Sequence, residues 1–145
     1  HQFTKVEQFC VTHKEESSAM FSSMMDLSRK FYDSLGISYR VINIASAALN
    51  NSAAVKYDLE AWFCGSKEYM ELVSCTNTTD YFSNKINCTY QDGANKENVH
   101  MLNCTLCANT RTLCCLIEAY QTDTGFIIPI VLRPYLDNLE EYICE

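Results

Sequence analysis

The nine residues Val55-Lys56-Tyr57-Asp58-Leu59-Glu60-Ala61-Trp62-Phe63 decide the fold class of this chain. Residues at odd-numbered positions in this stretch are apolar, and those between them are charged, apart from the tryptophan. A period of two is typical of a β-strand, because successive side chains point to opposite faces of a sheet. The stretch therefore predicts a strand with one apolar face and one largely charged face.

Segments on both sides of this strand predict further strands and flanking helices. Apolar residues recur every three or four positions over 20–35 and again over 106–120, which indicates a helix in each segment. Apolar runs of strand length occur at 37–44, 69–75, 84–90 and 99–103, and a last one at 126–132. No crossover helix separates the central strands, so we expect an α+β fold, an antiparallel β-sheet flanked by helices.

The ends of the first helix carry their own signals. Thr12 and Glu15 have the spacing of a capping box, in which two side chains satisfy backbone N–H groups at a helix start. Gly36 can adopt the left-handed conformation that commonly ends a helix.

Composition limits the chain to one domain and excludes some partners. The 145 residues are 48% hydrophobic with only 4 Gly and 2 Pro, which leaves little room for linkers or disorder. The formal charge is −7, and the 11 basic residues are scattered, so this segment alone is not expected to bind a long phosphate backbone. Because the first residue is not methionine, we expect the chain to begin inside a larger protein.

The cysteines favour a reducing, cytoplasmic environment. Nine is an odd number, and two of the cysteines, Cys114 and Cys115, are adjacent, which fits free thiols better than a disulfide framework. Cys104 and Cys107 form a lone CxxC without a second ligand pair, so it is weak evidence for a metal. Four N-x-S/T sequons would suit a secreted glycoprotein, but no signal peptide and no apolar span of about 18 residues accompanies them.

Oxygen-bearing side chains on two neighbouring strands form a candidate metal site. Asp58 and Glu60 share one face of their strand, and Glu71 and Ser74 lie on the next. Carboxylate and hydroxyl oxygens are ligands that Mg²⁺ prefers, with phosphates completing its coordination. The alternative, which the pattern alone favours, is that Asp58 and Glu60 form the solvated face of a half-covered sheet.

Arg111 is the second candidate, because it stands on a largely apolar helix. A buried guanidinium needs an anionic partner, which is either a ligand or an internal carboxylate such as Glu118 or Asp123. No glycine-rich phosphate loop is present, so phosphate chemistry would rest on side chains and metal. Taken alone, Phe3 and Glu7 are typical of a core aromatic and a surface acid.

Several segments together closely resemble the carboxy-terminal part of the class II catalytic domain of seryl-tRNA synthetases. The segments run through nearly the whole chain in the order of that family: HQFTKVEQF at 1–9, similar to the second half of motif 2, YDLEAWF at 57–63, ELVSC at 71–75, TDY at 79–81, LNCTLCANTRT at 102–112, similar to motif 3, and VLRPY at 131–135. We therefore interpret residues 1–145 as a partial catalytic domain of this class.

The resemblance implies that serine, ATP and Mg²⁺ form seryl-adenylate, after which the seryl group passes to serine tRNA. Phe3 would stack on adenine, and Arg111 would hold the ATP tail as a catalytic group. Glu71 and Ser74 would hold Mg²⁺ against the phosphates. The serine pocket would be formed by Glu7, Asn103 and Thr105. The resemblance further implies a cytoplasmic homodimer that does not bind membranes, and an isolated fragment that is inactive.

Departures from the family pattern support a second hypothesis. Ala47 and Ala48 stand where the family has Gly-Glu, Asn84 replaces an arginine, and Cys104 replaces a small residue. The alternative is therefore a diverged, non-catalytic module used for binding or assembly. Retention of a metal-binding Glu-x-x-Ser beside an ATP-binding arginine favours the enzyme, because a module without turnover would not need both.

Overall fold

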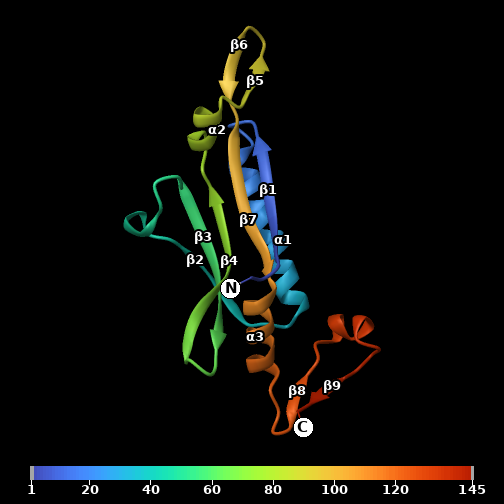
Figure 1. The fold of residues 1–145 in the computed structure, drawn as a ribbon. Helices are drawn as coiled ribbons and strands as arrows, with labels where there is room; N and C mark the ends of the chain where they lie inside the picture. Colours follow the sequence, from blue (N-terminus) through green and yellow to red (C-terminus); the bar gives the residue numbers. More distant parts are fainter. Residues whose placement is uncertain (1, 145) are drawn as a thin grey trace.

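Five antiparallel strands form the central sheet of the computed structural model, which describes residues 2–144. Their spatial order is β1 (Lys5–Thr12), β7 (His100–Ala108), β4 (Glu68–Asn77), β3 (Val55–Phe63) and β2 (Tyr39–Asn43). Every neighbouring pair is antiparallel, so the predicted α+β class is confirmed. Helix α1 (Ser17–Ser34) runs along one face of this sheet (Figure 1).

Smaller elements project from both ends of the sheet. Helix α2 (Tyr81–Ile86) and the hairpin of β5 (Thr89–Asp92) and β6 (Asn95–Asn98) connect β4 to β7. Helix α3 (Asn109–Tyr120) continues directly from β7, and an arm follows it, with β8 (Gly125–Ile127), η2 (Ile130–Tyr135) and β9 (Glu141–Ile143). A short turn, η1 (Ser46–Ala48), joins β2 to β3. The hairpin and the arm lie at opposite ends of the molecule (Figure 1).

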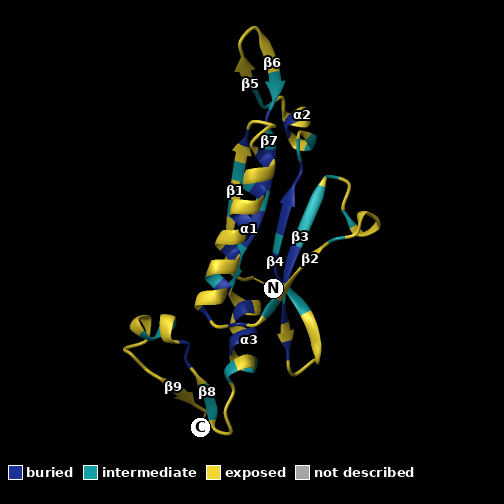
Figure 2. Ribbon diagram, turned by 180° about the vertical axis from the view of Figure 1, so that it is seen from behind, coloured by how far each residue is buried: buried dark blue, intermediate teal, exposed yellow. Residues whose placement is uncertain are grey.

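The core lies between α1 and the sheet. Side chains on the inner face of α1, such as Phe21, Met24 and Tyr32, are buried, whereas its outer face is exposed (Figure 2). Ser28 is fully buried at the middle of this contact and links three elements. Its hydroxyl accepts a hydrogen bond from Gln8 of β1 at 3.0 Å and lies 3.0 Å from the backbone oxygen of Thr105 in β7. This polar contact fixes the position of α1 along the length of both strands.

The strand predicted at 84–90 is wrong. Residues 81–86 form α2 instead, and the strand β5 begins only at Thr89. Ser83 is fully buried at the centre of α2, and its hydroxyl donates to the backbone oxygen of Val99. Asn87 ends the helix in the left-handed conformation, with φ +53°. Tertiary anchoring of a short segment therefore decides its conformation here.

The boundary between β7 and α3 also differs from the prediction. The strand extends to Ala108 and the helix starts at Asn109, so Cys107 lies in the strand and not in a helix. The cause is β1, a strand that the sequence pattern did not predict, which pairs with β7 from Lys5↔Ala108 to Thr12↔His100. Cys107 and Ala108 pair with Val6 and Lys5 instead of entering a helix, and Leu106 is the bulged residue between the two halves of this pairing.

The predicted capping box is absent, but the predicted helix end is confirmed. Thr12 makes no capping hydrogen bond, its hydroxyl is buried without a partner, and α1 begins five residues later. At the other end Gly36 has φ +69°. Its N–H donates to Asp33, and the N–H of Ile37 donates to Tyr32, which together form a Schellman motif.

Strand β1 is one of the two edge strands of the sheet, β2 being the other, so one side of its backbone has no strand partner within residues 2–144. Apolar side chains along it, including Val6, Phe9 and Val11, are about half exposed or more. No helix in the described part of the chain is long and apolar enough to span a membrane.

We predict that Gly36→Ala lowers the free energy of unfolding by at least ~2 kcal/mol, because it combines left-handed strain with a clash. A Cβ at this position would collide with the Tyr120 hydroxyl, which donates to the backbone of Leu35. The matched control is Gly93→Ala, which has φ +58° and open space around it, and should cost only ~1 kcal/mol of strain. Urea denaturation of the complete protein measures both, and equal losses would contradict the proposed clash.

Tyr32 predicts an alkaline loss of stability. Burial raises the pKa of Tyr32 to about 12, against a partly opposing hydrogen bond with Thr112. The folded state then holds the phenolic proton to a higher pH than the unfolded state, so stability should fall by about 2 kcal/mol between pH 10 and 12. Tyr32→Phe should be ~1 kcal/mol less stable at pH 8, from the lost hydrogen bond, yet less sensitive to alkali. Urea midpoints across this pH range measure the slope, with the exposed Tyr135→Phe as control.

Candidate functional site

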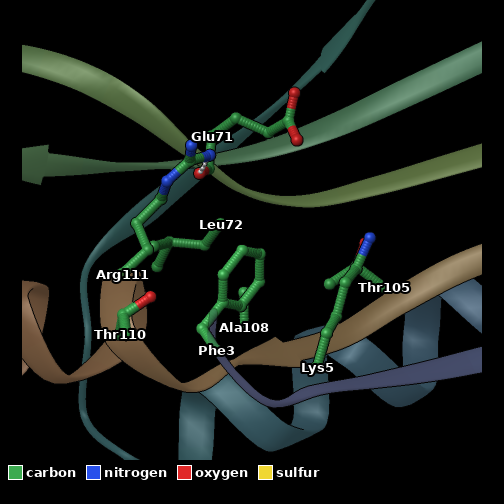
Figure 3. A pocket seen from close by; sticks show the side chains of 8 residues that line it. All are labelled: Phe3, Lys5, Glu71, Leu72, Thr105, Ala108, Thr110 and Arg111. Carbon is green, nitrogen blue, oxygen red and sulfur yellow. Dashed lines mark hydrogen bonds between the residues drawn. The ribbon is translucent and has the colours of Figure 1, made fainter. Parts of the chain in front are cut away.

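A cavity of about 230 Å³ opens on the face of the sheet opposite α1 (Figure 3). Its lining comes from the chain before β1, from β1 itself, from β4 and β7, and from the start of α3. The residues are Phe3, Lys5, Glu71, Leu72, Thr105, Ala108, Thr110 and Arg111. An aromatic ring, two cations and a carboxylate thus share one opening.

Phe3 is held at the cavity by its neighbours and not by burial, since 52% of the side chain is exposed. The N–H of Thr4 donates to Asn109 Oδ1 at 3.2 Å, and the N–H of Asn109 donates to the Thr4 oxygen at 3.0 Å. Asn109 is the first residue of α3. This reciprocal pair fixes the segment before β1 against the helix that carries Arg111.

Arg111 reaches from the first turn of α3 to strand β4. Its Nη1 donates to the backbone oxygen of Glu71 at 2.6 Å, while the Glu71 carboxylate extends away from the guanidinium (Figure 3). Arg111 makes no ion pair with Glu118 or Asp123, so of the two alternatives the internal salt bridge is wrong. Glu118 instead accepts a hydrogen bond from the N–H of Gly65. The guanidinium is exposed to the cavity and keeps most of its donors free for an anion.

A second group of polar residues lies along β1 and β7. Glu7 accepts a hydrogen bond from Asn103 Nδ2 at 3.0 Å and forms an ion pair with Lys5 at 2.9 Å. A register shift between Val6 and Glu7 places Glu7 directly opposite Thr105. Each carboxylate oxygen of Glu7 therefore has its own donor. The three predicted serine-site residues lie together, although Glu7 is 96 or more positions away from Asn103 and Thr105 in the sequence.

A third group lies on β3 and β4. The ring of Tyr57 packs on Phe21 of α1, with centroids 5.0 Å apart, so the adjacent Asp58 points to the opposite face. Asp58 lies opposite Ser74, and Lys56 Nζ is 3.2 Å from Asp58 Oδ2 and 3.8 Å from Glu71 Oε2.

The expectation that Asp58 and Glu60 form a solvated face is wrong for Asp58, which is only 5% exposed. Glu60 forms a salt bridge with Arg40 at 2.8 Å, and the register shift beside it leaves Leu72 of β4 without an opposing residue in β3. The extra residue lies in β4, so β3 keeps its alternation, and Glu71 comes to share one face of the sheet with Ser74 and Asp58.

The electrostatics of Glu71 reflect these neighbours. Burial, followed by the Asp58 carboxylate, raises the pKa of Glu71 above its ordinary value, and Lys56 and Arg111 partly oppose that rise. One oxygen of Asp58, Oδ1, is buried and has no hydrogen-bond partner. The carboxylates of Asp58 and Glu71 therefore lie close together, and Lys56, the cation beside both, is within hydrogen-bond distance of Asp58 only.

The donor set fits Mg²⁺ shared with phosphates better than a metal held by protein alone. Within residues 2–144 no three His, Cys, Asp or Glu side chains are grouped to hold a metal. Mg²⁺, however, usually takes one or two carboxylates and completes its shell with water and phosphate oxygens. Glu71, Ser74 and the unpartnered oxygen of Asp58 meet that requirement.

Four of the seven predicted site residues line the cavity itself: Phe3, Glu71, Thr105 and Arg111. Glu7 and Asn103 lie beside it through their mutual hydrogen bond, and Ser74 lies opposite Asp58. Sequence reasoning missed Lys5 and Lys56 as site residues. Each stands two positions before an acid, at Glu7 and Asp58, which in a strand is a same-face spacing and could have revealed both.

The positions that depart from the family pattern make local contacts away from the cavity lining. Asn84 Nδ2 donates a hydrogen bond to Asp80, the residue before α2, at 2.7 Å. Ala47 and Ala48 lie in the η1 turn. Cys104 is fully buried, and its thiol faces Ser28 of α1.

Comparison with known proteins identifies relatives along the whole chain. Residues 1–120 match the family model described as tRNA synthetase class II core domain (G, H, P, S and T). The cytoplasmic serine–tRNA ligase of Dictyostelium discoideum is 54% identical over 140 residues, which are 94% of this chain and 31% of that protein. The cytoplasmic enzyme of Saccharomyces cerevisiae is 48% identical, over 99% of this chain and 32% of that protein. The chain thus spans about a third of the length of the curated relatives it matches.

Two solved structures resemble the whole chain. Cytoplasmic serine–tRNA ligase from Naegleria fowleri, in complex with AMP, has a TM-score of 0.94 at 51% identity, and the match covers 100% of this chain and 35% of that one. Seryl-tRNA synthetase from Pyrococcus horikoshii, complexed with ATP, has a TM-score of 0.95 at 34% identity, over 100% and 33% of the two chains.

The reciprocal contact of Thr4 and Asn109 yields a local prediction. Asn109→Ala should speed amide exchange at Thr4 about fivefold, because the hydrogen bond it removes is worth ~1 kcal/mol. Asn109→Asp keeps an acceptor at the same place, next to a helix N-terminus that favours negative charge, and should stay close to wild type. Hydrogen exchange of the complete protein measures this, and an unchanged rate in Asn109→Ala would show that the segment before β1 is held by other contacts.

Proposed function

The chain belongs to the family of class II tRNA synthetase core domains, and from this we propose that it forms the ATP- and serine-binding part of a serine–tRNA ligase. The complete protein would form seryl-adenylate from serine, ATP and Mg²⁺, and would then transfer the seryl group to serine tRNA. The single observation that carries the proposal is the cavity shared by Phe3, Glu71, Thr105 and Arg111. The relatives named serine–tRNA ligase support the choice of serine.

Adenylate formation sets requirements that these residues can meet. A serine carboxylate oxygen attacks the α-phosphorus of ATP, a new O–P bond forms, and pyrophosphate leaves with the bonding electrons. The step needs alignment and neutralised phosphate charge more than a proton-transferring base. In this proposal Phe3 stacks on adenine and fixes the nucleotide, and Arg111 binds the phosphate tail through its free donors.

Glu71 and Ser74 are the proposed Mg²⁺ ligands of this chain. When bound, the ion would neutralise charge on the phosphate oxygens. Partial burial of Glu71 beside the Asp58 carboxylate supports the assignment, because two neighbouring carboxylates are favourable mainly where a cation compensates their charge.

Serine would be recognised by Glu7, Asn103 and Thr105. Glu7 is oriented by its two donors, Lys5 and Asn103, so its carboxylate is positioned before the substrate arrives. A site that hydrogen-bonds a hydroxyl rejects alanine, since the polar groups of the site would then remain unpaired. The homodimer and the cytoplasmic location stay predictions from the resemblance, as does the contact with tRNA.

We predict that the complete protein exchanges labelled pyrophosphate into ATP only when serine and Mg²⁺ are present. Arg111→Met should lower kcat/KM for ATP about a hundredfold or more, because it removes charge stabilisation at the phosphates. Arg29→Met, which removes an exposed guanidinium from α1, is the matched control and should retain activity. No serine-dependent exchange by the complete, folded protein would favour the non-catalytic alternative.

A further inference from the structure

Lys56 occupies a position between two carboxylates that the proposed mechanism does not explain. It belongs to β3, and its side chain is 24% exposed. Its ammonium group lies 3.2 Å from Asp58 Oδ2 and 3.8 Å from Glu71 Oε2. These are the only ion pairs of either acid among residues 2–144, so Lys56 supplies their cationic contact in the metal-free protein.

The carboxylate of Asp58 lies in a buried position. Its side chain is 7% exposed, and burial of an unpaired carboxylate costs several kcal/mol. Glu71 is close enough for the two acids to repel each other, which is one reason that the pKa of Glu71 is raised. The pair of carboxylates therefore has a strong requirement for positive charge.

Lys56 meets this requirement incompletely. Asp58 Oδ1 is buried and receives no hydrogen bond, and the distance to Glu71 exceeds a good hydrogen bond. The hydroxyl-bearing Ser74, opposite Asp58, makes no contact with the ammonium that would complete a cage. An ammonium on a flexible four-carbon stem can also leave a site at little cost, unlike a residue fixed by packing.

We propose that Lys56 is a resident counter-cation that a divalent metal ion displaces from Asp58 and Glu71. This inference rests on the proposed function, because the same carboxylate, Glu71, is the proposed ligand. Lys56 holds the two acids together before substrates bind, which keeps Glu71 in place and the sheet stable. When the ion arrives, the ammonium moves to solvent, since two cations beside the same carboxylates repel each other. Lys56 thus lowers the affinity for metal in the absence of ATP.

The test measures Mn²⁺ binding to the complete protein without ATP or serine, by the electron paramagnetic resonance signal of free Mn²⁺. Lys56→Met should bind Mn²⁺ about tenfold more tightly, because a competing positive charge is removed. Lys56→Arg keeps the charge and should stay near wild type. Lys30→Met removes one exposed lysine from α1 and is the matched control for net charge. Asp58→Asn should weaken binding about tenfold.

A second readout protects the test against misfolding. Lys56→Met should unfold at a lower temperature than wild type without metal, and MnCl₂ should raise its midpoint more than that of wild type. If the folded variant binds Mn²⁺ with unchanged or lower affinity, Lys56 is only a structural partner and the inference is overturned. Lys56→Gln repeats the measurement should the methionine variant not fold. Pyrophosphate exchange is measured separately. If the wild-type protein shows serine-dependent exchange while Lys56→Met gains no affinity for Mn²⁺, only this inference is refuted and the proposed function stands.

Discussion

The antiparallel pairing of β1 with β7 is the constraint on which the candidate site depends. It joins residues near the start of the chain to residues about a hundred positions later, and its register shift turns Glu7 toward Thr105. The same pairing extends β7 to Ala108, so that α3 starts where Arg111 can reach β4. A slip of one residue would move every side chain of β1 to the other face and separate these groups.

One face of the sheet carries the packed core, and the other carries the polar residues of the candidate site. On the face covered by α1, apolar side chains pack around the buried Ser28, which hydrogen-bonds to both neighbouring strands. On the other face, charged residues remain near one another at a cost that packing elsewhere must offset. Thr105 belongs to both, since its backbone oxygen contacts Ser28 while its side chain lines the cavity. A rigid core thereby holds the polar groups in position.

Sequence patterns predicted the fold class and the central strands, because 55–63 keeps a clear period of two and its neighbours are apolar runs of strand length. They failed where long-range contacts decide. Strand β1 shows no simple alternation of apolar and polar residues, and several of its apolar side chains are exposed. Residues 84–86, predicted to begin a strand, belong to α2 instead, because Ser83 is anchored to the backbone before β7. Residue chemistry alone indicated Glu71, Ser74 and Arg111 as candidates, whereas the roles of Phe3, Glu7, Asn103 and Thr105 came from resemblance to a family. The bulge at Leu72, which brings Glu71 to the same face as Asp58 and Lys56, is not encoded by any local pattern.

The open edge of β1 has a consequence for handling this chain. An outermost strand with unpaired backbone groups and half-exposed apolar side chains is a template on which further strands can add. The net charge of −7 opposes such addition by repulsion between molecules, but salt screens that repulsion over about 10 Å at 0.1 M. The tendency of the chain on its own to associate should therefore depend on ionic strength. The chain should stay in solution at low salt and associate through its edge strand as the salt concentration increases.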